Sequence, residues 1–307
     1  MLIVIALGGN ALLQRGEPLT VENQRAHTKI AARSIAEVIA AGHQVVITHG
    51  NGPQVGLLAL QGAAYKPDEA YPLDVLGAET EGMIGYLIEQ ELENALPAGQ
   101  QVVMLLTQVE VDPNDPAFSE PSKPVGPVYT KQEADSLAAK RDWVVAPDGD
   151  HFRRVVASPK PIAIPDAPVV ELLLKNGIIV ICAGGGGIPI VRQADGTSVG
   201  IEAVIDKDRA SALLAQKLGA DMLLMLTDVE AVYENWGTTE QSTIRQISAK
   251  TVIEMPLAKG SMQPKVEAAC DFVNATDGHA GIGTLKDALK IVEGSAGTLI
   301  SKRLPLM

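Results

Sequence analysis

The 307-residue sequence contains only two cysteines, too few for a disulfide framework. Cys182 lies in an apolar run and Cys270 in an expected helix, so we expect two buried thiols, as in a reducing cytoplasm. The sequence has no run of about 18 apolar residues that could span a membrane. Its amino terminus carries neither a basic segment nor a cleavage-like site, which predicts a cytoplasmic, unprocessed protein.

Basic residues are also scarce. The chain has 25 Lys and Arg against 37 Asp and Glu, which gives a formal net charge of -12. Because a field of this sign repels nucleic acids and anionic membranes, neither is an expected partner. If the protein binds phosphate groups, a few local cations must hold them.

The common signatures of nucleotide and hydrolase sites are missing. The sequence contains no G-x-x-x-x-G-K-[ST] motif, and its glycine clusters do not extend to G-x-G-x-x-G because Val55 and Pro189 occupy the last position. The protein-kinase motifs and the G-x-S-x-G nucleophile elbow are also missing. The five histidines lack metal-ligand spacing and are best explained as core or surface residues. Among them His49 stands out because it borders a turn.

Three glycine-rich turns, each directly after a short apolar run, are the most informative feature that is present. They are Gly8-Gly9-Asn10, Gly50-Asn51-Gly52 and Gly184-Gly185-Gly186-Gly187. The preceding runs are rich in Val and Ile and have the length of buried parallel strands. Ligands of such sheets gather beyond the carboxyl ends of the strands. Since glycine lets backbone amides approach a bulky anion, the turns predict a phosphate-like ligand.

The rest of the chain alternates helices and strands, which predicts an α/β fold. Helices are expected over 20–41, 74–95, 206–218, 264–276 and 284–292 and after Pro168, and strands over 2–7, 45–48, 102–106, 178–183, 222–226 and 298–300. Eight prolines between residues 108 and 162 exclude long regular elements there, apart from a small hairpin around Asp148-Gly149. We interpret this segment as an inserted lid over two facing lobes, 1–175 and 176–307.

Three lysines, one at an expected helix start and two framed by prolines, are the candidate cations. Asp206-Lys207 opens an expected helix, where Asp206 could hold a phosphate-binding Lys207 in place. An ordinary N-cap with a solvated lysine explains this pair equally well. Lys123 and Lys265 are framed by prolines, and each alone is more readily a surface residue. Together with the glycine amides, three lysines would suit phosphoryl transfer, which needs positioning and positive charge.

A further candidate is Thr227-Asp228-Val229, which follows an expected strand and leads towards Tyr233. Its simplest explanation is a turn at the strand end, stabilised by an Asx-type hydrogen bond. The alternative is that this segment lines a nucleotide pocket, with Tyr233 against the base.

Eight motifs in order along nearly the whole chain resemble those of the carbamate kinases. They are Ala6 to Asn10, His49 to Gln54, Lys123 to Pro127, Arg153 to Pro159, Ala183 to Pro189, Glu202 to Asp208, Leu226 to Val229 and Gly260 to Lys265. The resemblance implies the amino-acid-kinase fold, a three-layer α/β/α sandwich on a mainly parallel sheet, usually in a homodimer. It also implies the reversible reaction of ATP with carbamate to give ADP and carbamoyl phosphate, with Mg²⁺.

The resemblance also implies a role for each candidate residue. Lobe 1–175 would bind the carbamate and the transferred phosphoryl group, and lobe 176–307 would bind the nucleotide. Lys123, Asp206, Lys207 and Lys265 would be catalytic. The substrate would lie against Gly8, Gly9, Asn10, Gly50, Asn51, Gly52, Gly184 and Gly185. The nucleotide would lie against Thr227, Asp228, Val229, Tyr233, Lys207 and Lys265. No residue is implied as a metal ligand.

Three positions bear on the substrate. Related acid kinases have a lysine where this chain has Ala6, which favours carbamate and leaves Lys123 to replace that lysine. Gln263 stands where the family usually has glycine, and residues 278–283 differ from the family's usual strand. Two alternatives therefore remain: a kinase of the same fold for another small acid, such as acetate or an amino acid, and a non-catalytic sensor of nucleotide or carbamoyl phosphate.

Overall fold

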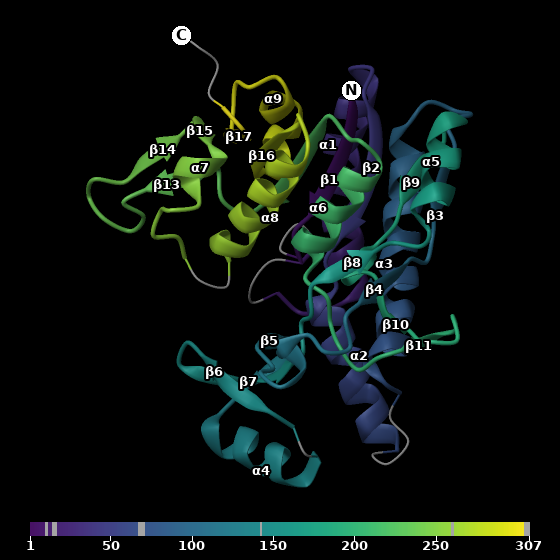
Figure 1. The fold of residues 1–307 in the computed structure, drawn as a ribbon, viewed down its shortest axis with the longest axis vertical. Helices are drawn as coiled ribbons and strands as arrows, with labels where there is room; N and C mark the ends of the chain where they lie inside the picture. Colours follow the sequence, from purple (N-terminus) through teal and green to yellow (C-terminus); the bar gives the residue numbers. More distant parts are fainter. Residues whose placement is uncertain (10–11, 14–16, 67–70, 142, 259–260, 304–307) are drawn as a thin grey trace.

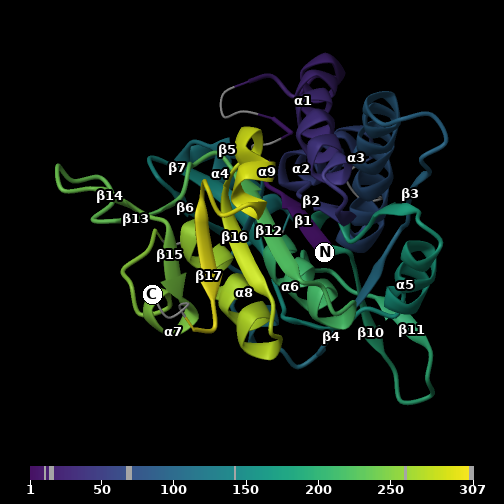
Figure 2. The ribbon, with the colours of Figure 1, turned by 90° about the horizontal axis from the view of Figure 1, so that it is seen from above.

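The computed structural model describes residues 1–9, 12–13, 17–66, 71–141, 143–258 and 261–303 (Figure 1). It confirms the predicted α/β fold, in which a large, mostly parallel sheet lies between two layers of helices (Figure 2). Within the described ranges, none of the helices combines the length and apolar character needed to cross a membrane.

Eight strands of the described residues form the central sheet. From one edge to the other they are β15 (Gln246–Ser248), β17 (Thr298–Ser301), β16 (His279–Thr284), β12 (Met222–Thr227), β1 (Leu2–Leu7), β2 (Gln44–His49), β9 (Ile179–Ile181) and β3 (Val102–Met104). The strands from β16 to β3 are parallel, whereas β17 pairs antiparallel with β16 and parallel with β15. The predicted strands all lie in this sheet.

Alternating side chains of β1 explain the two helical layers, because successive residues of a strand point to opposite faces. Ile3 and Ile5 pack with one set of helices, α1 (Val21–Ala40), α3 (Leu73–Ala95) and α9 (Ala288–Val292). Val4 and Ala6 pack with the other set, α5 (Ala167–Lys175), α6 (Lys207–Lys217) and α8 (Met262–Ala275). Each fully buried isoleucine stabilises the fold by roughly 1.5–3 kcal/mol. The apolar strands are therefore buried on both faces.

Helix α1 begins and ends where the sequence predicts. The side chain of Thr20 accepts a hydrogen bond from the backbone N–H of Asn23, and Gly42 follows the helix with a φ of +87°. The predicted helix after residue 206 is likewise confirmed as α6, with Asp206 as its N-cap.

Three smaller sheets surround the sandwich. One contains β11 (Ser198–Gly200), β10 (Ile188–Arg192), β4 (Gln108–Val111) and β8 (Pro161–Ala163). Another is the hairpin of β13 (Val232–Glu234) and β14 (Ser242–Ile244). The third contains β5 (Lys123–Tyr129), β7 (His151–Val156) and β6 (Val145–Asp148), which project from the sandwich with α4 (Lys131–Arg141) (Figure 1). Short helices complete the described chain: η3 (Pro116–Phe118), η4 (Gly184–Gly186), η5 (Leu285–Asp287) and α7 (Ala249–Val252).

The segment interpreted as a lid contains the expected hairpin, β6 and β7, but the exclusion of long elements there was wrong. Helix α4 has 11 residues, because the stretch from residue 128 to 146 contains no proline. The sequence interpretation also missed α2 (Gly52–Tyr65). The lobe boundaries, and the action of this segment as a lid, stay predictions.

Strand β16 was missed as well, because glycines interrupt its apolar pattern. A Cβ atom on Gly281 would lie 2.8 Å from Ile291 of α9, and one on Gly283 would lie 2.6 Å from the same side chain. Glycine therefore lets α9 approach the sheet. The predicted helix 284–292 is accordingly shorter and consists of η5 and α9.

Candidate active site

Four neighbouring strands, β12, β1, β2 and β9, end at the same edge of the central sheet. The three predicted glycine turns follow β1, β2 and β9. Strand β12 ends at Thr227, and Asp228 is the next residue. Helices α2 and α6 begin close to these ends, with Gly52 and Lys207 as their first residues. This edge therefore gathers turn amides and helix amino ends, which attract anions.

The first two turns are in direct contact. The backbone N–H of Gly8 donates to Leu226 at 2.8 Å, and that of Gly50 donates to Leu7 at 3.1 Å. A Cβ atom on Gly50 would lie 3.3 Å from the backbone nitrogen of Gly9 and 3.4 Å from Cδ of Lys207. The second turn therefore packs closely against the first turn and the stem of Lys207, with little room for a side chain at position 50.

The four-glycine turn packs against the second turn and against the start of α6. Gly185, Gly186 and Gly187 all have a positive φ, which L-residues with a side chain rarely adopt. A Cβ atom on Gly185 would collide with the side chain of Asn51, and one on Gly186 would collide with the backbone of Ile205. Asn51 is buried and donates from Nδ2 to Thr80 Oγ1 at 2.8 Å. The turn thus joins the strand ends to the Asp206 segment.

Three lysines converge on two aspartates at this edge. Lys123 Nζ lies 2.6 Å from Asp206 Oδ2, and this contact joins β5 to α6. Lys207 Nζ lies 2.6 Å from Asp208 Oδ1, and Lys265 Nζ lies 3.0 Å from Asp208 Oδ2. The other carboxylate oxygen of Asp206 caps α6 by accepting from the N–H groups of residues 208 and 209. Of the three lysines that Asp206 was expected to orient, it therefore contacts Lys123 alone, whereas Asp208 holds Lys207 and Lys265.

Burial and pairing set the charge of this cluster. The Asp208 side chain is only 4% exposed. Burial alone would raise the pKa of Asp208, but Lys207 and Lys265 outweigh burial and hold it well below its usual range. Lys123 likewise lowers the pKa of Asp206 against the effect of burial. Burial also tends to lower the pKa of Lys265, yet pairing with Asp208 raises it overall. Both carboxylates are therefore ionised at neutral pH.

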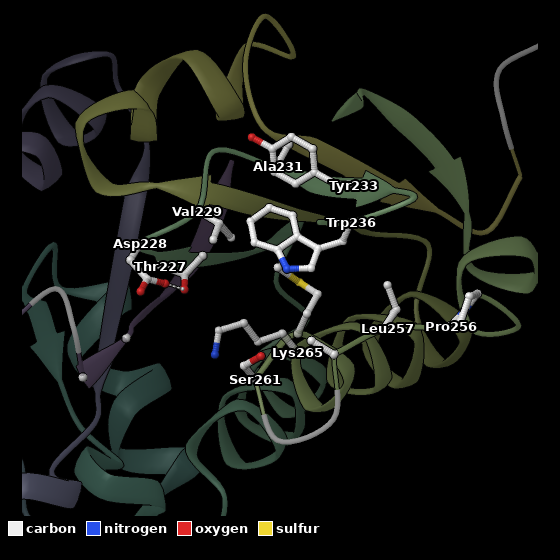
Figure 3. Close-up of a pocket in the computed structure, with 14 residues that line it drawn as sticks. Thr227, Asp228, Val229, Ala231, Tyr233, Trp236, Pro256, Leu257, Ser261 and Lys265 are labelled. Atoms are coloured by element: carbon white, nitrogen blue, oxygen red, sulfur yellow. Dashed lines mark hydrogen bonds between the residues drawn. The ribbon is translucent and has the colours of Figure 1, made fainter. Parts of the chain in front are cut away.

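A cavity of about 380 Å³ opens beside the first turn and the end of β12 (Figure 3). It contains five of the residues predicted to bind nucleotide, Thr227, Asp228, Val229, Tyr233 and Lys265, whereas Lys207 is not in its lining. The Tyr233 and Trp236 rings lie 5.0 Å apart between centroids. Pro256 and Leu257 also line the cavity and lie to the right of the Trp236 indole in Figure 3. The cavity is thus apolar and aromatic at one side and has a lysine at the other.

Most predicted site residues are thus gathered at one edge, and the exceptions are few. Asn10 and Gly260 lie outside the described residues. Gln263 donates to Glu267 at 2.9 Å and leaves the contact between Lys265 and Asp208 in place.

Sequence reasoning missed Asp208, Trp236 and Thr80. The first two had a usable signal, since Asp208 adjoins Lys207 and Trp236 is an aromatic residue close to Tyr233. Thr80 lies within a long helix and had none.

The described residues contain no group of three or more His, Cys, Asp or Glu side chains that could hold a metal ion. Asp206 and Asp208 direct carboxylate oxygens to lysines instead. A Mg²⁺ ion usually takes one or two protein carboxylates and completes its shell with phosphate oxygens and water. The described acidic residues therefore offer no ligand set of their own, and a Mg²⁺ ion would have to be held largely by nucleotide phosphates.

Comparisons with known proteins agree with the motifs. A model of the amino acid kinase family matches residues 1–282. A carbamate kinase of Rhizobium meliloti is 57% identical over 303 residues, which cover 98% of this chain and 93% of that protein. A carbamate kinase of Haemophilus influenzae is 56% identical, with 99% of this chain and 97% of that protein covered.

Solved structures give the same result. The carbamate kinase of Giardia lamblia bound to AMP-PNP matches with a TM-score of 0.89 and 40% identity over 98% of both chains. The same enzyme bound to citric acid matches with a TM-score of 0.92. The chain therefore belongs to the amino acid kinase family and, within it, to the carbamate kinases.

Proposed function

We propose that this protein catalyses the reversible transfer of a phosphoryl group between ATP and carbamate, giving ADP and carbamoyl phosphate. One observation carries the proposal: lysines from β5, α6 and α8 converge on Asp206 and Asp208 beside the glycine turns of adjacent strands. Such an arrangement supplies positive charge and backbone donors where a phosphoryl group would migrate. The carbamate kinase relatives support the choice of reaction.

The nucleotide would occupy the cavity beside β12. Its base would lie between the aromatic side chains and the wall around Leu257, and its phosphates would point to Lys265 and, beyond the cavity, to Lys207. The Giardia lamblia enzyme bound to AMP-PNP, an ATP analogue, supports a nucleotide site in this fold. Thr227, Asp228 and Val229 would line the passage between base and phosphates.

The carbamate and the migrating phosphoryl group would lie against the three glycine turns. Gly8, Gly9 and Asn10 would form one side, Gly50, Asn51 and Gly52 the next, and Gly184 and Gly185 the third. Lys123 would approach from β5 and exchange part of its contact with Asp206 for the reacting oxygens. Asp206 would orient this lysine, and Asp208 would orient Lys207 and Lys265.

Catalysis would need no covalent intermediate on the protein. The carbamate oxygen attacks the terminal phosphorus of ATP in line, the bond from phosphorus to the bridging oxygen breaks, and ADP leaves with that electron pair. Fixed lysines stabilise the negative charge that develops on the equatorial and bridging oxygens. Mg²⁺ bound to the nucleotide would neutralise further phosphate charge.

Formation of ATP from carbamoyl phosphate, ADP and Mg²⁺ tests the reaction, with acetyl phosphate and an acyl phosphate of an amino acid as rival substrates. A preference for either rival would show a kinase for another acid. Calorimetric binding of nucleotide without any ATP formation would show a sensor instead.

We also propose a setting for the enzyme: a cytoplasmic homodimer that runs towards ATP synthesis in arginine or purine and allantoin breakdown. The support is the sequence resemblance, together with the charge balance that disfavours nucleic acid and membrane partners. Light scattering on purified protein tests the homodimer. The genes next to its own test the pathway.

A further inference from the structure

Two buried titratable side chains lie against the four-glycine turn and have no part in the reaction as described above. His49 is the last residue of β2, Glu81 lies in α3, and both side chains are fully buried. A Cβ atom on Gly184 would collide with the imidazole of His49 and would lie 2.7 Å from Cγ of Glu81. The backbone of the turn therefore rests directly on these two side chains.

Glu81 connects both ends of the turn through Thr107. Its Oε2 atom accepts from the backbone N–H of Thr107 at 3.1 Å. Thr107 in turn accepts from the N–H of Ala183 at 3.0 Å through Oγ1 and from that of Ile188 at 2.8 Å through its carbonyl. Glu81 and Thr107 thus hold the residues on either side of the four glycines.

The hydrogen bonds of His49 fix its tautomer. Nδ1 lies 3.1 Å from the carbonyl oxygen of Gly50, which can only accept, so Nδ1 carries the proton. Nε2 is therefore an acceptor. Nε2 of His49 and Oε1 of Glu81 are both buried and lack a hydrogen-bond partner among the described residues. The two side chains approach the same glycine, Gly184, from different elements.

Burial decides the charge of both groups. It raises the pKa of Glu81 to about 8, and backbone hydrogen bonds only partly oppose it. It lowers the pKa of His49 to about 4, and Lys207 adds to this shift. The other titratable groups that face Glu81 are Asp166 and Cys182, and neither brings a positive charge. At neutral pH both side chains are therefore uncharged, and Glu81 keeps an O–H donor.

We propose that protonated Glu81 and neutral His49 are a positioning pair that holds the four-glycine turn in its phosphate-binding conformation, and that loss of the Glu81 proton weakens phosphate binding. This inference rests on the proposed function of the turn. The N–H groups of Gly186 and Gly187 donate within the turn, to Ala183 and Gly184, so an anion would meet the remaining amides of this concave backbone. A carboxylate directly beneath those amides would repel the phosphoryl group and turn N–H groups towards itself.

Glu81→Gln is the decisive variant, because an amide keeps one acceptor and one donor but cannot ionise. Initial rates with carbamoyl phosphate and ADP are measured on both sides of about pH 8 for the wild type and the variant. The ratio of the wild-type rate to the variant rate at each pH cancels the pH dependence of the substrates. We expect the KM of the wild type for carbamoyl phosphate to rise above this pH by up to about tenfold per pH unit, while that of the variant stays level.

Glu81→Leu, which removes both hydrogen-bonding atoms, should lower kcat/KM by about 10- to 100-fold at every pH. The matched control is Gly82→Ala in the same helix, where a Cβ atom meets nothing within 4 Å and both rate and pH profile should stay unchanged. The Glu81→Gln profile decides the matter even if the leucine variant does not fold. If the wild type and Glu81→Gln lose activity equally at alkaline pH, the proposal is overturned. Normal activity of Glu81→Leu also overturns it.

A measurement without turnover separates this inference from the proposed reaction. The thermal stabilisation of the protein by inorganic phosphate is compared between the wild type and Glu81→Gln below and above about pH 8. We expect phosphate to lose its effect on the wild type alone at the higher pH. Absence of phosphate stabilisation at neutral pH, or equal loss in both proteins, overturns the inference. A wild type that binds phosphate but forms no ATP overturns only the reaction.

Discussion

Of two buried clusters at the strand ends, one is ionised and the other is neutral. Asp208, Lys207 and Lys265 are ionised because each charge lies within 3.0 Å of an opposite one. His49 and Glu81 are neutral because burial disfavours their charged forms and no opposite charge within the described residues pairs with either of them. Burial is similar in the two clusters, so the neighbours decide the charge. The ionised cluster therefore supplies positive charge, and the neutral cluster positions the turn without adding charge.

Removing the charge of Asp208 should break the ionised cluster. Asp208→Asn leaves two buried lysines without a counterion, so we expect the free energy of unfolding to fall by about 3–5 kcal/mol. ATP formation should be lost as well, because the lysines move apart or lose their protons. Urea unfolding measures the loss of stability, and ATP formation from carbamoyl phosphate and ADP measures the loss of activity.

The matched control is Asp135→Asn in α4, whose pair with Lys131 at 3.2 Å is exposed. This variant should cost about 0.5 kcal/mol or less. If the two variants destabilised the protein equally, the distinction between buried and exposed pairs would not hold here.

Lys123 tests whether a charge can matter for rate without mattering for stability. Its side chain is 31% exposed, and its pair with Asp206 joins β5 to α6. Lys123→Ala should lower kcat by about 10²–10³-fold, as loss of an oxyanion donor does. The free energy of unfolding should change by about 1 kcal/mol or less. Near-normal turnover in the folded variant would remove Lys123 from the mechanism.

The neutral pair should give the protein two opposite pH sensitivities. The pKa of His49 is depressed, so its contribution to stability is present above about pH 6.5 and is lost as pH falls through about 4. The pKa of Glu81 is raised, so its contribution is present below about pH 4.5 and is lost as pH rises through about 8. The window of His49 should be worth about 3 kcal/mol and that of Glu81 about 5 kcal/mol.

Urea unfolding across this range, with His49→Gln and Glu81→Gln, measures the two windows separately. Each variant should lose the pH dependence of its own window and keep that of the other. Between about pH 4.5 and 6.5 the two effects oppose each other in the wild type, whereas only Glu81 acts between about pH 6.5 and 8. A wild-type stability that is level from pH 6.5 to 8 would mean that the pKa of Glu81 is not raised in the fold.

The same contrast explains what the sequence could predict. Apolar runs followed by glycine predicted the strand ends, and a helix start or neighbouring prolines predicted the lysines, because these signals are local. The partner of each cation was not predictable, since Asp206 and Asp208 are two residues apart and their choice depends on where β5 and α8 lie. Glu81 was missed for a different reason. A glutamate in a long helix is usually exposed, and only the tertiary packing against Thr107 and Gly184 buries it.

Trp236 belongs to neither cluster, so its substitution separates the aromatic part of nucleotide binding from the charged part. Its indole is uncharged, lines the cavity near Lys265 and belongs to a side chain that is 58% exposed. Stacking of a base on an aromatic ring is worth about 1–3 kcal/mol, so Trp236→Ala should raise the KM for ADP by about tenfold. Because the indole carries no charge that could stabilise the migrating phosphoryl group, kcat should change little. The matched control is Trp143→Ala, since that indole lies between Arg141 and Arg154 near β7 and should leave the KM for ADP unchanged. A fall in kcat without a change in KM would instead place Trp236 with the catalytic charges.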